Sequence, residues 1–326
     1  HSGAVDAPEA WEHSLGEGVT VAVADSGVNA NHLDLIGKIA EGGYDFVEED
    51  HEPQDETGHG THVAGTIAAR GLNGVGVIGL APEASILPLR VLDHRGRGYM
   101  SDVAEAFDYA GKRGVRIVNA SLGGGPLTVV RNVIASYPNT LFVIAAGNEA
   151  ADNDKPASAS YPCAYPEPNI VCVSASDRED ALADFSNFGR TAVDLAAPGV
   201  DIVSAWHTSP FAYVATDGTS MAAPHVAGAA ALALAAAPQS KAFQLKWALL
   251  SSADSTTALA GTSVSGGRLN AAAVVTAITS DAVPTKPPEP EPTPVPPAVT
   301  TQPPVTPQPP AVNPPTPPAQ PAPPAA

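Results

Sequence analysis

Three glycine-flanked segments of the 326-residue sequence carry side chains that are used in acyl transfer. They are 25–28 (DSGV), 58–66 (GHGTHVAGT) and 218–228 (GTSMAAPHVAG). A serine hydroxyl is a poor nucleophile at neutral pH and needs a base such as histidine to accept its proton. That imidazole in turn needs a carboxylate to fix its tautomer and stabilise its charge. Asp25, His59 and Ser220 supply this set, and their separation in sequence predicts a triad that folding must assemble.

The residues after His59 and Ser220 predict two helix starts. An apolar stretch, 63–69, follows His59 and places it at the beginning of a helix, facing a cleft. Thr219 is predicted to cap a helix over 220–236, so that Ser220 lies in its first turn beside unpaired backbone N–H groups. Such groups can bind a developing oxyanion. Pro224 should remove one backbone hydrogen bond from this helix.

Each of these residues also has a purely structural interpretation. Asp25 is compatible with a turn after a strand, and Ser220 with a serine near a helix N-cap. His59 and His62 have the His-x-x-His spacing of half a metal site, but the glutamate of the zinc-protease pattern His-Glu-x-x-His is absent. For one residue alone the structural interpretation is favoured. The presence of all three segments favours catalysis.

Short apolar runs must position these side chains. They are mostly continuous rather than alternating, which is typical of strands covered on both faces, and they lie at 19–24, 86–92, 116–120, 141–146, 170–175 and 192–197. Helical patterns over 101–113 and 129–136 lie between them. Strand followed by helix, repeated, predicts a doubly wound α/β fold.

Polar residues at the ends of these runs are the first candidates for a site. Asp25, Ser121 and Asn148 each follow an apolar run. Parallel sheets bind ligands at the carboxyl ends of their strands. We therefore expect the three side chains to lie along one edge of the sheet.

With its motifs in the order Asp, His, Ser, the sequence resembles the subtilisin-like serine peptidases over about residues 18–272. The resemblance implies an α/β fold with a doubly wound, mostly parallel seven-stranded sheet and helices on both faces. It also implies a secreted, monomeric serine endopeptidase that acts through an acyl-enzyme on polypeptide substrates. An inhibitory propeptide that assists folding and is then removed is implied as well, and the start at His1, without a methionine, agrees with this.

The resemblance assigns roles to further residues. Asn148 corresponds to the oxyanion-hole asparagine of the family and would act together with the backbone N–H of Ser220. Two backbone segments would pair with an extended substrate by strand addition, and they are Gly96-Arg97-Gly98 and Ser121-Leu122-Gly123. Arg97 replaces the small residue expected between the two glycines. It is compatible with a preference for acidic substrate residues or with an orientation to solvent, and the second is favoured.

The resemblance also implies a pocket for the substrate residue that precedes the scissile bond. Glu149 and Ser160 would form its base, and its wall would consist of Ala145, Ala146 and Gly147. Small wall residues predict a broad specificity with a preference for large apolar side chains. Glu149 leads to the further hypothesis that lysine is accepted there.

Calcium is the cofactor that the resemblance implies. Asp34 corresponds to a calcium ligand of the family, and Asn73 lies in the loop that completes the site with oxygens. The N-terminal side-chain ligand of the family has no clear counterpart, and the loop around residues 70–71 differs in length. Asp34 is also compatible with a simple turn residue.

Composition divides the chain into two parts. Of 34 prolines, 20 lie in 281–326, which leaves 14 in the first 280 residues. The sequence thus predicts a catalytic domain over 1–280 and a Pro-rich, partly polyproline tail over 281–326, interpreted as a linker or stalk or as a ligand for a proline-binding groove. The longest apolar run, 222–237, is shorter than the roughly 20 residues of a membrane span and is broken near its start.

Charge and cysteine content restrict the function further. Sixteen basic and 34 acidic residues give a net charge of −18, which disfavours nucleic-acid binding. Cys163 and Cys172 are too few for a multi-cysteine zinc site. The sequence leaves open whether they form a disulfide, because the distance between their Cα atoms decides it. An inactive homologue that binds partners through the Pro-rich tail is the alternative function.

Overall fold

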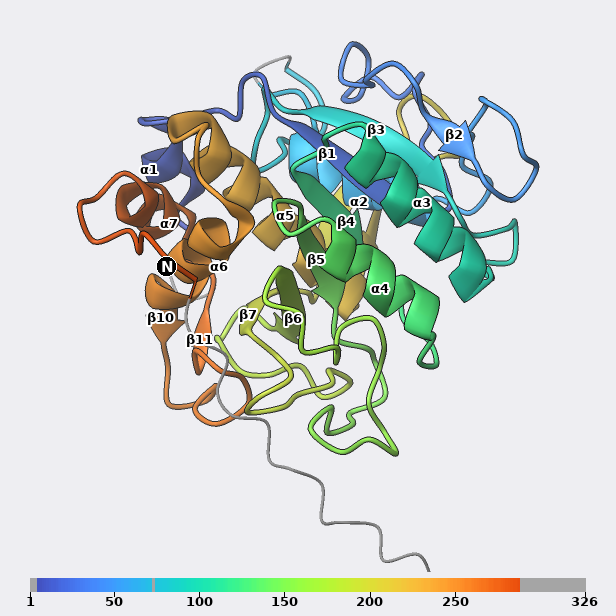
Figure 1. Cartoon of the computed structure of the whole chain (residues 1–326). Coiled ribbons are helices and arrows are strands. Elements are labelled where there is room, and N and C mark those ends of the chain that lie inside the picture. Colours follow the sequence, from blue (N-terminus) through green and yellow to red (C-terminus); the bar gives the residue numbers. More distant parts are fainter. Residues whose placement is uncertain (1–4, 72–73, 288–326) are drawn as a thin grey trace, which may run out of the picture. The chain divides into compact units, whose positions relative to one another are not determined.

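The computed structural model describes residues 5–71 and 74–287, and these form a three-layer α/β unit (Figure 1). Nine strands make one sheet, in the order β10 (Asp254–Ser255), β11 (Gly267–Arg268), β7 (Leu195–Pro198), β6 (Ile170–Ser176), β5 (Leu141–Ala145), β4 (Ile117–Ala120), β1 (Thr20–Asp25), β3 (Ser85–Arg90) and β2 (Tyr44–Asp45). Every neighbouring pair is parallel except β10 with β11. The mostly parallel, doubly wound fold is confirmed. The two short strands β10 and β11 extend one edge, so the sheet has nine strands rather than seven.

Helices cover both faces of the sheet (Figure 1). Alternate residues of each strand point to opposite faces, so Val21 and Val23 join one apolar cluster while Ala22 and Ala24 join the other. One face carries α3 (Met100–Lys112) and α4 (Thr128–Ser136). The other carries α1 (Ala7–Trp11), α2 (His59–Ala68), α5 (Thr219–Ala236), α6 (Ala242–Ser251) and α7 (Ala271–Ile278). A hairpin of β8 (Ile202–Ala205) and β9 (Tyr213–Thr216) packs beside α2.

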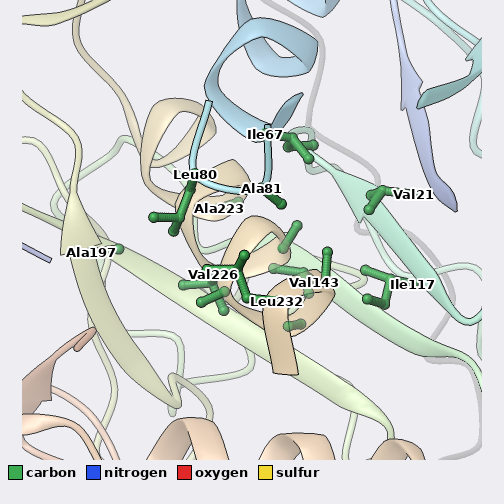
Figure 2. Close-up of a cluster of buried hydrophobic side chains, with 14 of the residues drawn as sticks. Val21, Ile67, Leu80, Ala81, Ile117, Val143, Ala197, Ala223, Val226 and Leu232 are labelled. Atoms are coloured by element: carbon green, nitrogen blue, oxygen red, sulfur yellow. The ribbon is translucent and has the colours of Figure 1, made fainter. Parts of the chain in front are cut away.

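Helix α5 is the central helix of the larger cluster. Figure 2 shows Val226 and Leu232 of this helix among the side chains of Ile117 and Val143 from β4 and β5. Its many alanines are small, which lets the helix approach the sheet closely, and Pro224 lies inside it. Among the described residues, α5 has the length and apolar character of a membrane span, but 78% of it is buried inside the protein.

Parallel pairing brings three strand ends to one edge of the sheet. Val23 of β1 pairs with Asn119 of β4, and Ala120 of β4 pairs with Ile144 of β5. The chain therefore leaves β1, β4 and β5 at the same edge. This is the arrangement expected for Asp25, Ser121 and Asn148, which follow or end these strands.

The described chain continues past the predicted start of the Pro-rich tail. Val283 packs against the main core, and Gln244 Nε2 donates to Pro284 O at 3.0 Å. Residues 281–287 therefore contact the folded unit. The remainder of the tail, and Asn73 of the predicted calcium loop, lie outside the described residues.

Candidate active site

Asp25 and His59 form a hydrogen-bonded pair at the end of β1. His59 Nδ1 lies 2.7 Å from Asp25 Oδ1, and Ser26 N donates to the same oxygen at 2.7 Å. Asp25 is fully buried, whereas the His59 side chain is one-third exposed. Burial lowers the pKa of His59, but the charge and hydrogen bond of Asp25 raise it more, so the pKa lies above its ordinary value of 6.5. This imidazole is oriented by a carboxylate and accessible from outside.

Close packing between α2 and β1 makes this pair possible. A Cβ atom on Gly60 would lie 2.1 Å from Gly27 O, so only glycine allows the first turn of α2 to approach the end of β1. The glycines that flank the Asp and His motifs therefore have a steric role in the site.

Asp55 holds the N-terminus of α2 and was missed by the sequence analysis. Its Oδ1 accepts from Gly58 N at 2.8 Å, and its Oδ2 accepts from Thr61 N and Thr61 Oγ1 at 2.9 and 2.6 Å. Ser26 Oγ also donates to Asp55 at 2.9 Å. The negative charge of Asp55 contributes to the raised pKa of His59. An acidic residue four positions before His59, at a predicted helix start, was the available signal.

Ser220 lies in the first turn of α5, next to the segment that follows strand β4. Its Oγ donates to Ser121 O at 3.1 Å, and Ser121 Oγ donates back to Ser220 O at 2.8 Å. Ser121 and His59 line the same cleft. No hydrogen bond joins His59 to Ser220 in the described chain. The structure therefore brings Asp25 and His59 into direct contact and holds Ser220 through Ser121.

Thr219 has a different role from the predicted helix cap, and that prediction is wrong. Helix α5 begins at Thr219 itself, after Gly218, and no side chain caps it. The Thr219 hydroxyl instead donates to Asn148 Oδ1 at 2.9 Å and accepts from Gly147 N at 3.1 Å. The Thr219 hydroxyl bonds to Asn148 instead of to its own helix because the segment after β5 lies beside the start of α5.

The contacts of Asn148 fix which end of its amide is free. Its Oδ1 accepts from both Thr219 N and Thr219 Oγ1, each at 2.9 Å. The Nδ2 group and the backbone N–H of Ser220 have no hydrogen-bond partner within residues 5–71 and 74–287. Two N–H donors at the start of α5 are therefore available to an anionic oxygen.

Two buried asparagines, which no sequence motif predicts, organise the segment that follows β5. Asn187 Oδ1 accepts from Glu149 N and Ala151 N at 3.0 and 2.9 Å. Asn187 Nδ2 and Asn153 Nδ2 both donate to Ala146 O, at 3.0 and 2.9 Å. The three contacts of Asn187 span 36 to 41 residues of sequence. No local pattern identifies such partners.

The predicted pocket residues lie beside this network. Glu149 Oε2 accepts from Asn148 N at 2.9 Å and from Asn187 Nδ2 at 3.1 Å. A Cβ atom on Gly147 would lie 2.3 Å from Asn187 Nδ2, and one on Gly123 would lie 2.4 Å from Ser160 Oγ. The structure therefore brings Gly147 together with Glu149, and Gly123 together with Ser160.

Cys163 and Cys172 form a disulfide, which answers the question that the sequence left open. Their Cα atoms are 5.0 Å apart, and both residues are buried. Asn153 Nδ2 also contacts Cys163 Sγ at 3.4 Å. The bond thus joins the segment that carries Ser160 to strand β6.

An open cleft of about 940 Å³ runs past His59. Gly96, Arg97 and Gly98 line one part of it, and Ser121, Leu122 and Gly123 line another. The apolar residues Leu92, Met100 and Val103 also face it. The two predicted substrate-binding segments therefore border one open groove.

The other histidines of the two motifs, the buried His62 and the half-buried His225, are neutral. His62 Nε2 lies 2.9 Å from Ile202 O, and His225 Nδ1 lies 2.9 Å from Met221 O. Burial lowers the pKa of each to about 4. Within the described part of the chain, no three His, Cys, Asp or Glu residues gather as a metal site. His59 and His62 therefore have separate partners.

Asp34 lies beside another side-chain oxygen, that of Tyr213. It is fully buried, and its Oδ2 accepts from Val77 N at 3.0 Å. The Tyr213 hydroxyl is buried beside it, and burial together with the Asp34 carboxylate raises the pKa of Tyr213 to about 12. A Cβ atom on Gly76 would lie 2.0 Å from Tyr213 Oη and 2.2 Å from Asp34 Oδ2. Carboxylate and hydroxyl oxygens suit a hard cation such as calcium.

Comparisons with known proteins match most of the chain. The profile of the subtilase family matches residues 16–277. Thermitase from Thermoactinomyces vulgaris is 42% identical over 273 residues, which cover 82% of this chain and 92% of that protein. Subtilisin BL from Lederbergia lenta is 42% identical over 232 residues, covering 70% and 81%. An intracellular serine protease from Paenibacillus polymyxa is 43% identical over 239 residues, covering 70% of each chain.

Solved structures agree with these sequence matches. A crystal structure of a cold adapted subtilisin-like serine proteinase superposes with a TM-score of 0.70 at 37% identity, covering 79% of this chain and 90% of that one. A protease from Pseudoalteromonas arctica superposes with a TM-score of 0.77 at 31% identity, covering 85% and 95%.

Proposed function

The chain belongs to the subtilase family and is a serine endopeptidase, and we propose that Asp25, His59 and Ser220 are its catalytic triad. The 2.7 Å contact between His59 Nδ1 and Asp25 Oδ1 carries this proposal. With Nδ1–H donated to Asp25, the lone pair of His59 Nε2 is left as the base.

The proposed reaction has two stages. His59 Nε2 accepts the proton of Ser220 Oγ while this oxygen attacks the carbonyl carbon of the scissile bond. His59 then returns the proton to the leaving amine, and the C–N bond breaks to leave an acyl-enzyme. A water molecule, deprotonated by His59, then attacks the ester carbon, the bond to Ser220 Oγ breaks, and His59 returns the proton to this oxygen.

Asn148 and the Ser220 backbone would stabilise the oxyanion that forms in each stage. Both donors are free, as described above, and Thr219 fixes the orientation of the Asn148 amide. Donors that are already oriented stabilise developing charge without reorganisation, and removal of one such donor typically lowers kcat by about 10²–10³-fold.

The substrate residue before the scissile bond would bind beside Ala146, Gly147, Glu149 and Ser160. Small residues in this wall support broad specificity with a preference for large apolar side chains. The Glu149 carboxylate already accepts from Asn148 N and Asn187 Nδ2. Because these two bonds partly satisfy its charge, lysine would be a secondary rather than a preferred residue.

Secretion is supported by the disulfide between Cys163 and Cys172. Disulfides persist in oxidising compartments and are rare in the cytosol.

The proposal includes a propeptide that assists folding, inhibits the enzyme and is removed, and a monomeric mature enzyme without a membrane span.

Calcium is proposed as a structural cofactor held by Asp34 and Asn73. Asp34 fits this role because it is a buried carboxylate facing a second oxygen, that of Tyr213. When bound, the ion would link the chain around Asp34 to the loop that contains Asn73.

Residues 1–280 would form the catalytic domain, with the Pro-rich segment 281–326 as a linker or stalk.

Labelling with a fluorophosphonate tests the triad directly, because this reagent reacts with an activated serine. We expect the wild-type enzyme to be labelled at Ser220 and to cleave a denatured protein mixture mainly after large apolar residues. Ser220→Ala should lose both reactions, whereas Ser101→Ala on the exposed start of α3 should retain them. An unlabelled wild-type enzyme, or a label on another serine, would contradict the proposed triad.

A further inference from the structure

The cleft beside His59 has the opposite charge to the protein as a whole. The chain has a net charge of −18. Nevertheless, the charged side chains that line the cleft, apart from histidines, are Arg95, Arg97 and the single carboxylate of Glu56. Glu56 Oε2 is paired with the buried Arg90 Nη2 at 2.5 Å. Arg90 Nη1 also pairs with Asp45, so Glu56 is only partly neutralised, but two guanidinium groups against one carboxylate still leave the cleft lining with a net positive charge.

Neither Arg95 nor Arg97 forms an ion pair with a carboxylate in the described chain, although the charge of Arg95 helps to lower the pKa of the nearby Asp93. Arg95 Nε donates to His94 Nε2 at 3.2 Å, and both arginines are exposed. By contrast, Arg131, Arg178 and Arg268 each form an ion pair with an acidic residue. The two cleft guanidinium groups are thus available to a ligand in a protein whose surface is rich in acidic groups.

Asp93 holds the loop that presents these arginines. Its Oδ1 accepts from Arg95 N at 2.8 Å and from Arg97 N at 3.0 Å, and Asp93 N donates to Arg97 O at 2.7 Å. These backbone hydrogen bonds lower the pKa of Asp93. The carboxylate of Asp93 is directed to the backbone, and the loop keeps one shape while the two side chains extend from it.

A peptide in the cleft would pass close to this loop. Arg97 lies between Gly96 and Gly98 in one of the two segments that border the groove, and Ser121, Leu122 and Gly123 form the other. Gly98 is packed too tightly for a side chain, because a Cβ there would lie 1.9 Å from Val91 O. Arg97 is therefore the side chain of this segment that can reach a substrate residue.

We propose that Arg95 and Arg97 make the enzyme select peptides with acidic side chains among the residues that precede the scissile bond. This selection rests on the proposed function, in which the peptide runs between the two segments. A guanidinium group recognises a carboxylate through charge and paired N–H donors. The apolar cleft residues would bind the rest of the peptide, so the arginines would add preference to a site of otherwise broad specificity.

The acidic surface of the protein opposes this selection at a distance, and salt limits how far the surface charge acts. Its negative field repels acidic peptides at a distance, but salt screens exposed charges beyond about 8 Å at physiological ionic strength. Contact with Arg95 or Arg97 occurs within that range. We therefore expect selection at contact, and its magnitude should be that of exposed ion pairs, about 1.5- to 5-fold for each pair.

Matched peptides that differ at one position test this proposal. Glu, Gln and Lys are compared at each of the second, third and fourth residues before a fixed scissile bond. For the wild-type enzyme in moderate salt, kcat/KM should be about 2- to 5-fold higher with Glu than with Gln at one or more positions. The ratio should approach one in 1 M salt.

Variants test whether the two arginines cause the difference in kcat/KM between the Glu and Gln peptides. Arg97→Gln and Arg95→Gln should each lower the Glu-to-Gln ratio, and the double variant should remove it. Arg178→Gln changes the net charge equally at an exposed site outside the cleft lining, and it should keep the wild-type ratio. A wild-type ratio of one at all three positions, or an equal ratio in the double variant, overturns the proposal. Failure of the proposed function is a different result, because no peptide would then be cleaved and Ser220 would not be labelled.

Discussion

The Asn148 side-chain oxygen accepts two hydrogen bonds from Thr219, one from its backbone N–H and one from its hydroxyl, both at 2.9 Å. This pair of bonds links the segment after β5 to the first turn of α5. Because the oxygen end of the amide is held, the N–H₂ end faces away from Thr219. The orientation of the proposed oxyanion donor therefore depends on a fully buried residue that does not line the described cleft.

Replacement of Thr219 by valine should lower kcat by about 10-fold and leave KM nearly unchanged. Valine keeps the shape but removes the hydroxyl that orients Asn148, and the expected loss is smaller than the 10²–10³-fold typical when the donor itself is removed. Steady-state kinetics on a neutral peptide measure both constants. Thr219→Ser, which retains the hydroxyl, should recover most of kcat. An equal loss in both variants would point to a packing effect instead.

Asn148→Leu should lower kcat by about 10²–10³-fold with little change in KM, because the amide donor stabilises the oxyanion and not the bound substrate. The same kinetic assay applies, and circular dichroism would verify that the fold is intact. If KM rises while kcat is retained, Asn148 contributes to substrate binding and is not an oxyanion donor.

The activity of the wild-type enzyme should rise with pH through a pKa above 6.5, the ordinary value for histidine. His59 must be neutral to act as a base, and the net effect of Asp25 is to raise its pKa, so the acidic limb of kcat/KM moves to higher pH. Asp25→Asn should lower kcat by about 10⁴-fold and move the limb of the residual activity to lower pH. A limb that stays in place would show that Asp25 does not control this titration.

Loss of the disulfide should destabilise the enzyme by about 3 kcal/mol, the value expected from the chain entropy of a loop of about ten residues. The variant with Cys163→Ala and Cys172→Ala should therefore melt at lower temperature than the wild type. Reductant should lower the melting temperature of the wild type and leave that of the double variant unchanged. Thiol alkylation monitors reduction, and a fully reduced wild type with an unchanged melting curve would contradict the prediction.

Removal of calcium should lower the melting temperature. An ion present at 100 times its Kd stabilises the folded state by about 2.7 kcal/mol, and a chelator abolishes this term. Asp34→Asn weakens the proposed site, so its melting curve should respond less to the chelator than that of the wild type. Calorimetric titration of the metal-free protein measures binding directly. Identical wild-type curves with and without chelator would count against a structural ion.

The sequence alone determined those features that local patterns encode. Continuous apolar runs predicted buried parallel strands, and the bounds agree closely, as for the predicted 86–92 and the observed β3, Ser85–Arg90. The position of His59 at a helix start was also predicted, because α2 begins at this residue. Asp25, His59 and Ser220 could be proposed as a triad because their three glycine-flanked motifs occur together, whereas each motif alone also fits a structural role.

Contacts between distant segments were decided only by the tertiary structure. Thr219 was expected to cap its own helix, but Asn148, 71 residues away, accepts its hydrogen bond instead. Asn187 holds Glu149 from 38 residues away, and no sequence period encodes that contact. The disulfide depended on a Cα separation of 5.0 Å that composition cannot supply.

The charge of the cleft is also determined partly by the sequence and partly by the tertiary structure. The sequence gives the net charge and the presence of Arg97, from which an orientation to solvent was favoured. Only the fold shows that Arg95 and Arg97 line the cleft beside His59 while the nearby Glu56 is paired with Arg90. Charge is a sum along the chain, but the field in a cleft depends on which charges fall within a few ångströms of one another, and that distance is set by packing.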